Sequence, residues 1–113
     1  MSEAIRLLYS PFPSHAAAAE AARALLAARQ VGCCNLLPGV TALYAWQGAL
    51  EESQEVVLLA KTTESQAEEA ARHLARLHPY TCPAILILAA HANTAYAQWL
   101  AGECTPEPAP PGP

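Results

Sequence analysis

The side chains best suited to chemistry in this sequence are its four histidines, four cysteines and ten glutamates; aspartate is absent. Imidazole suits copper, nickel and zinc, thiolate selects soft ions such as Cu(I), and carboxylate adds hard oxygen ligands. Side chains of these three types can together hold a divalent metal ion. Each also has a structural interpretation: a histidine bonded to a helix C-terminal carbonyl, a solvated acid beside a turn, and a small buried thiol.

The four cysteines, at positions 33, 34, 82 and 104, do not form a recognised metal or redox motif. No C-x-x-C pair occurs, which disfavours a zinc ribbon or a thioredoxin-like centre. Adjacent residues of a strand point to opposite faces, so Cys33 and Cys34 are poorly placed to bridge each other. No export signal opens the chain, and we expect reduced thiols in a cytoplasmic protein.

Composition excludes several classes of function. The net charge of −4, with one lysine among 113 residues, disfavours binding to a nucleic-acid backbone. The longest apolar run, residues 84–90, is too short to span a membrane. A Ser/His/Asp triad is impossible without aspartate, no nucleotide-binding glycine motif occurs, and Cys33 with His78 is the one nucleophile–base pair left open. We therefore expect no enzyme, no nucleic-acid partner and no membrane partner.

The first half of the chain contains the signals of a strand, a helix and a long hairpin. Residues 5–9 form an apolar strand, and Ser14 can cap an alanine-rich helix that runs to Arg29. Residues 33–62 alternate as two strands around a turn at 47–48, and Pro38-Gly39 should bend or bulge the first strand.

The second half repeats the strand and helix pattern. Thr63 and Gln66 form a capping box for a helix that stops at His78-Pro79. The wholly apolar residues 84–88 predict a central strand covered on both faces, and Asn93 can cap a last helix over 94–101. This order predicts an α+β, ferredoxin-like βαββαβ antiparallel sheet with a C-terminal helix, spanning residues 1–104. Residues 105–113 are proline-rich and should form a disordered tail.

A set of short motifs runs through most of the chain: Cys33, Asn35, Pro38-Gly39-Val40, Tyr44-x-Trp46-x-Gly48, Glu55, Lys61-Thr62, His78-Pro79-Tyr80, Pro83, Tyr96 and Trp99-Leu100. In this order and spacing they closely resemble the CutA family of divalent-cation tolerance proteins. The resemblance implies a trimeric ferredoxin-like protein, similar in architecture to PII signalling proteins and linked to tolerance of copper and other divalent ions, with no established reaction. Of the matched residues, His78, Glu55 and Cys33 are the candidate ligands for a divalent metal ion, while Thr81 and Ala84 stand where the family often has acids.

Two functions follow. The first is a metal-tolerance protein that holds a divalent ion, copper foremost, weakly through some of the candidate ligands His78, Glu55 and Cys33. The alternative is a PII-like trimeric sensor or interaction module with a small anionic ligand in clefts between subunits. Its candidate cleft residues are Lys61, Tyr44, Trp46 and Tyr80.

Either function requires more than one copy of the chain. Each hairpin arm can reach roughly 40 Å at ~3.3 Å per residue, well beyond a domain whose radius of gyration is ~13 Å. The hairpin should overhang its own helices and leave apolar strand edges that a second copy would cover.

Overall fold

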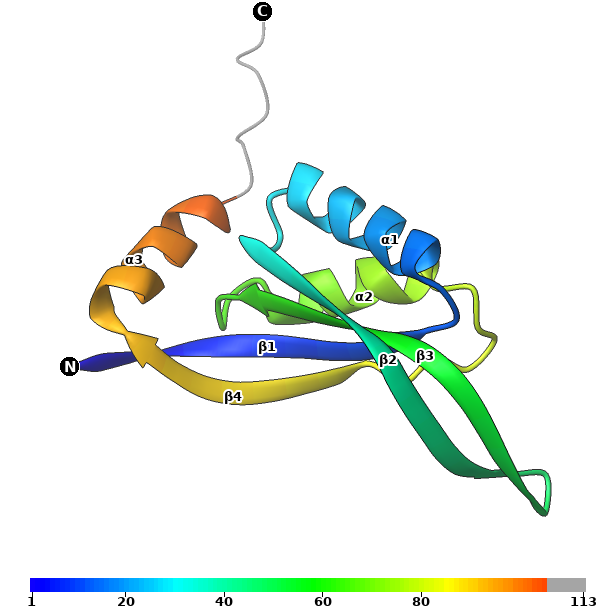
Figure 1. Ribbon diagram of the computed structural model, residues 1–113. Coiled ribbons are helices and arrows are strands. Elements are labelled where there is room, and N and C mark those ends of the chain that lie inside the picture. The colour runs from blue at the N-terminus through cyan, green and yellow to red at the C-terminus, as the bar shows by residue number, and fades with distance from the viewer. Residues whose placement is uncertain (106–113) are drawn as a thin grey trace, which may run out of the picture.

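A computed structural model describes residues 1–105 as a four-stranded antiparallel sheet with three helices (Figure 1). The sheet order is β2-β3-β1-β4, so β1 pairs with both β3 and β4. The predicted α+β ferredoxin-like fold is confirmed, and the predicted disordered tail falls almost entirely outside the described residues. The elements are β1 (Ser2–Phe12), α1 (His15–Ala27), β2 (Cys33–Trp46), β3 (Ala49–Thr62), α2 (Ala67–Leu77), β4 (Leu86–Asn93) and α3 (Thr94–Glu103).

Helices α1 and α2 cover one face of the sheet (Figure 1). Side chains alternate along a strand, so Leu8 and Phe12 of β1 share this face, and both are fully buried against the helices. Leu25 of α1 and Leu74 of α2 complete the same core. The alanines of α1 let that helix lie close to the sheet, which is why its sequence carries few large side chains.

Helix α3 packs against the end of the sheet where β1 begins (Figure 1). Ile5, three residues from Leu8 and therefore on the other side of β1, packs against Leu100 and Cys104. A Cβ at Gly32 would lie 2.6 Å from Leu100 Cδ1, so any other residue here would force the Leu100 side chain to move. None of the described helices is long and apolar enough to cross a membrane.

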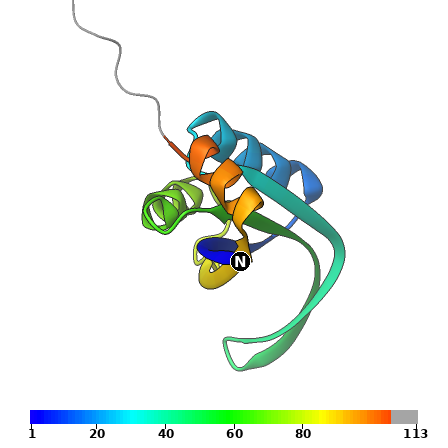
Figure 2. The ribbon, with the colours of Figure 1, turned by 90° about the vertical axis from the view of Figure 1, so that its left-hand side faces the viewer.

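The hairpin of β2 and β3 extends far beyond the helices and curves away from them (Figures 1 and 2). Gln47 (φ 49°) and Gly48 (φ 79°) form its turn, and positive φ at both central residues suits the right-handed twist of paired strands. Leu43 and Leu50 remain 66% and 81% exposed. The predicted overhang is confirmed.

The prediction that residues 84–88 form a central, doubly covered strand is wrong. Strand β4 lies at an edge, with Leu86 and Leu88 exposed at 45% and 41%. An apolar run indicates that both faces of a strand are buried in the functional protein, but it does not show whether the same chain or another chain buries them. Within one chain this part of β4 pairs only with β1.

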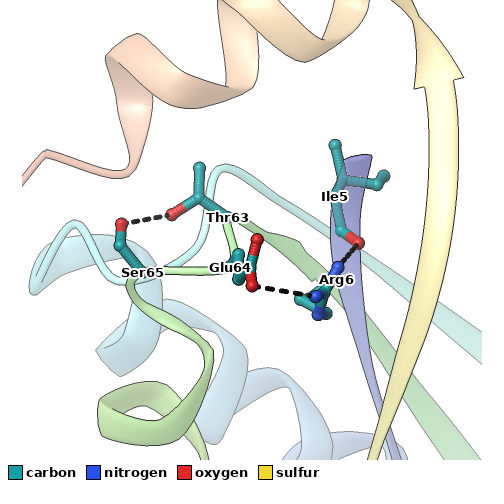
Figure 3. Close-up of polar contacts among 5 residues, drawn as sticks. All are labelled: Ile5, Arg6, Thr63, Glu64 and Ser65. Carbon is teal, nitrogen blue, oxygen red and sulfur yellow. Dashed lines mark hydrogen bonds and ion pairs between the residues drawn. The ribbon is translucent and has the colours of Figure 1, made fainter. Parts of the chain in front are cut away.

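The predicted capping box is also wrong. Helix α2 begins at Ala67, and Thr63 Oγ1 lies 3.2 Å from Ser65 Oγ instead of capping the helix (Figure 3). In the turn before the helix, the amides of Gln66 and Ala67 donate hydrogen bonds to the Thr63 carbonyl. Glu64 forms a 3.3 Å ion pair with Arg6 of β1 (Figure 3). Ser14, in contrast, caps α1 as predicted by accepting from the amide of Ala17.

Candidate functional site

An aromatic cleft of about 610 Å³ lies between the curved hairpin and the loop that follows α2. The hairpin supplies one wall and the loop supplies the other, so residues far apart in the sequence meet here. Tyr44, Trp46 and Tyr80, three of the four predicted cleft residues, line it together with the predicted ligand Glu55. The lining residues are Pro11, Ala42, Tyr44, Trp46, Ser53, Glu55, Pro79, Tyr80, Thr81, Cys82 and Ala84.

Strand register places the aromatic side chains on the same face as Glu55. Trp46 pairs with Ala49 and Tyr44 with Glu51, next to the turn, so both share the face of the odd-numbered residues of β3. Farther along β2, Leu37 pairs with Val57 but the next pair is Val40 with Glu55, so β2 contains one extra residue, which forms a β-bulge. The predicted bulge is therefore confirmed, and Gly39 supports it with φ 73°.

Glu55 is the charged centre of the cleft. Its side chain is only 9% exposed, and the Tyr80 hydroxyl donates a 2.8 Å hydrogen bond to Oε2. Burial, followed by the adjacent carboxylate, raises the pKa of Tyr80 to about 12, so the phenol remains a neutral donor. None of the residues that line the cleft is basic. The cleft is thus aromatic and negatively charged.

His78 has no nitrogen free for a metal ion. Its ring stacks on Phe12 with centroids 4.0 Å apart, and Nε2 lies 2.8 Å from the Pro11 carbonyl oxygen. The Tyr80 amide lies 3.2 Å from Nδ1. A carbonyl can only accept and an amide can only donate, so Nε2 carries the proton and Nδ1 uses its lone pair. Burial lowers the pKa of His78, which favours this neutral ring. The geometry contradicts the prediction that His78 is a ligand.

Cys33 and Lys61 lie away from the cleft, where β2 begins and β3 ends. They face each other across the two strands, with Lys61 Nζ 3.9 Å from Cys33 Sγ and 5.7 Å from the centre of the Tyr96 ring. Glu55 is six residues along β3, roughly 20 Å away at ~3.3 Å per residue. Within one chain Lys61 therefore lies outside the cleft that Tyr44, Trp46 and Tyr80 line, whereas the prediction placed all four residues in clefts between subunits.

The predicted ligands Cys33, Glu55 and His78 consequently do not form one site within a chain. Among residues 1–105, no group of three or more histidine, cysteine or acidic side chains is arranged to hold a metal ion. Within one chain Cys33 and His78 also have different neighbours, Lys61 for the thiol and the Pro11 carbonyl and Tyr80 amide for the ring, so they do not form a nucleophile–base pair there.

The other cysteines occupy three different environments. Cys34 points into the core, where burial raises its pKa to about 12, and burial also raises the pKa of Cys104. Cys82 is exposed and lines the cleft beside Tyr80. Our sequence interpretation did not place Cys82 or Ser53 at this site, although Ser53 shares a strand face with Glu55 because it lies two residues away.

A comparison with protein-family models matches residues 6–103 to the family described as CutA1 divalent ion tolerance protein. The chain belongs to the CutA1 family. The similarity runs from within β1 to the end of α3 and confirms the family indicated by the sequence motifs.

Individual relatives agree with this assignment. The divalent-cation tolerance protein CutA of Thermus thermophilus is 42% identical over 89 residues, which is 78% of this chain and 86% of that protein. CutA of Citrobacter koseri is 40% identical over 78% of this chain and 77% of its own length.

Solved CutA1 structures share the fold. The T. thermophilus protein superposes with a TM-score of 0.83 at 36% identity, covering 93% of this chain and all of its own. CutA1 from Pyrococcus horikoshii gives 0.84 at 35% identity over 88% and 98% of the two chains.

Proposed function

We propose that this chain is a non-enzymatic divalent-cation tolerance protein that binds copper and other divalent ions weakly in the cytoplasm as a homotrimer. Membership of the CutA1 family supports the general role in tolerance. The observation that carries the ion-binding proposal is Glu55, a buried carboxylate in a cleft without basic residues. Cys82 offers a thiol to the same cleft. Glu55 and Cys82 would supply two protein ligands, whereas a closed structural zinc site has four, so weak binding is expected.

The trimer is supported by the surfaces that a single chain leaves uncovered. The apolar edge of β4 and the hairpin residues Leu43, Trp46 and Leu50 are exposed, and such edges aggregate unless another chain pairs with them. Closed cyclic symmetry covers them all at once. Light scattering on an eluting peak should give about 36 kDa for three 11.9 kDa chains. A stable monomer at micromolar concentration would contradict the proposal.

Calorimetric titration with Cu(II), Zn(II) and Cu(I) tests the ion site. Glu55→Gln should weaken Cu(II) binding about tenfold or more, because it removes the buried charge while keeping the shape of the side chain. Glu52→Gln is the matched control, since Glu52 is exposed on the same hairpin and the net charge change is identical. Equal affinities of the wild-type and Glu55→Gln proteins would remove the cleft as the ion site.

The volume and aromatic walls of the cleft also favour a small-molecule ligand, as in the PII-like alternative. Its charge does not favour an anion, since Lys61 lies at the other end of β3 and any basic group would have to come from a partner chain. The same titration with a nucleotide separates the two functions. Nucleotide binding that Lys61→Ala abolishes would support the sensor and oppose the metal role.

The cytoplasmic location is proposed from the sequence alone. A CutA neighbour from Archaeoglobus fulgidus is described as periplasmic, and at 23% identity it shares only the fold. Fractionation of cells that express the full chain tests the location, and recovery in the periplasmic fraction would refute it.

A further inference from the structure

Cys33 and Lys61 form a thiol–amine pair that the backbone itself sets in place. Cys33 is the first residue of β2 and Lys61 is its direct partner on β3, and the amide of Gly32 donates a 3.0 Å hydrogen bond to the Lys61 carbonyl. Directly opposed side chains share a face, with Cβ atoms about 4.5–5.5 Å apart. The 3.9 Å separation of Sγ and Nζ is therefore a consequence of strand register.

The surroundings keep the amine beside the thiol. Lys61 forms no ion pair with an acid among residues 1–105, and its Nζ instead lies over the Tyr96 ring. Burial, followed by contact with Cys33, raises the pKa of Tyr96 to about 12, so a neutral ring covers the pair. Both Cys33 and Lys61 are only partly buried, which leaves room for a small oxidant to reach the sulfur.

No other cysteine in the described chain has a lysine as a partner, because Lys61 is the only lysine in the sequence. Cys34, the next residue, faces the core and keeps its proton, as its raised pKa shows. Cys104 is buried, and Cys82 lies at the cleft. Oxidation of Cys33 thus has an outcome that the other three thiols do not share.

We propose that a peroxide converts Cys33 and Lys61 into a sulfenamide cross-link that ties the beginning of β2 to the end of β3. The Cys33 sulfur first attacks the peroxide, the O–O bond breaks, and sulfenic acid and water form. Lys61 releases one proton to solvent, its free amine attacks the sulfur, the S–O bond breaks, and the hydroxyl leaves with a second amine proton as water. One thiol, one amine and one hydrogen peroxide give one S–N bond and two waters. The sulfur is oxidised by two electrons and the peroxide is reduced by two.

The cross-link removes the only lysine charge and is reversible. Two molecules of a small thiol reduce it, restoring Cys33 and Lys61 and yielding one small disulfide, because thiols attack oxidised sulfur. The pair is therefore a peroxide-sensitive modification site that is separate from the aromatic cleft.

Intact mass and digestion with a protease that cleaves only after lysine test this proposal on the full chain. After treatment with hydrogen peroxide, the mass should fall by about 2 Da, and the unfolded protein should resist cleavage after Lys61. Treatment with a thiol reductant should restore both the mass and the cleavage. Cys33→Ser and Lys61→Arg should each abolish the 2 Da loss, whereas Cys34→Ala, a matched control at the neighbouring thiol, should retain it.

A disulfide also lowers the mass by about 2 Da, and the digestion distinguishes it. Full cleavage after Lys61 with two cysteine peptides linked would overturn the proposal. Cleavage with Cys33 oxidised to sulfinic acid would overturn it as well. Both readouts use the wild-type chain, so a variant that fails to fold leaves the test intact.

Discussion

Replacement of His78 by alanine should destabilise the fold without weakening metal binding. The ring of His78 stacks on Phe12, and the residue is only 8% exposed. The ring also accepts a hydrogen bond from the Tyr80 amide and donates one to the Pro11 carbonyl. Each lost hydrogen bond costs about 1 kcal/mol and the stacked pair about 0.5–1.5 kcal/mol, and a small cavity adds to this. We expect a loss of about 2–4 kcal/mol in the free energy of unfolding.

The stability should also depend on pH through this ring. Burial lowers the pKa of His78 below its usual 6.5, so the unfolded chain binds the proton more readily than the folded chain. The stabilisation is complete above pH 6.5 and declines as the pH falls from there through the lower pKa of the folded state. A proton on Nδ1 would also face the Tyr80 amide, placing two donors against each other.

Urea unfolding monitored by tryptophan fluorescence, at one fixed chain concentration, measures both effects. His91→Ala is the matched control, because His91 is exposed on β4 and should change the stability by less than ~0.5 kcal/mol. The reasoning is refuted if His78→Ala unfolds like the wild type and loses Cu(II) affinity, since His78 would then be a ligand and not a packing residue.

Three further outcomes are expected from urea unfolding. Leu74→Ala should cost about 2–5 kcal/mol, because Leu74 is fully buried between α2 and the sheet; a cost below 1 kcal/mol would contradict this packing. Gly48→Ala should cost about 1–2 kcal/mol from its positive φ alone, since nothing lies within 4 Å of the added Cβ, and an unchanged midpoint would argue against this turn. Tyr80→Phe and Glu55→Gln should be non-additive by about 0.5–3 kcal/mol in a double-mutant cycle, and strict additivity would exclude their hydrogen bond.

Local patterns predicted the elements of this fold well. The Ser14 cap, the turn at 47–48 and the bulge at 38–39 each depend on the chemistry of a few neighbouring residues, and all three occur. Thr63 does not cap α2, because the helix begins only at Ala67 and the Thr63 hydroxyl lies beside Ser65. The contact of the intervening Glu64 with the distant Arg6 is one that no local pattern contains.

The candidate site was predictable only in part, for a similar reason. Residue types and family motifs identified Tyr44, Trp46, Tyr80 and Glu55, which do meet in one cleft. They could not show that both ring nitrogens of His78 form hydrogen bonds with backbone groups. Which candidates meet is decided by strand register and by the path of the loop after α2.

The extra residue at 38–39 affects the shape of the hairpin and not its register. Tyr44 and Trp46 lie opposite Glu51 and Ala49, next to the turn at 47–48, so deleting Gly39 would leave these pairs and the faces of the side chains unchanged. The deletion would remove the local bend and the added twist that a bulge gives its strand. The curvature of the hairpin, and with it the width of the cleft, would then change without replacing any side chain that lines it.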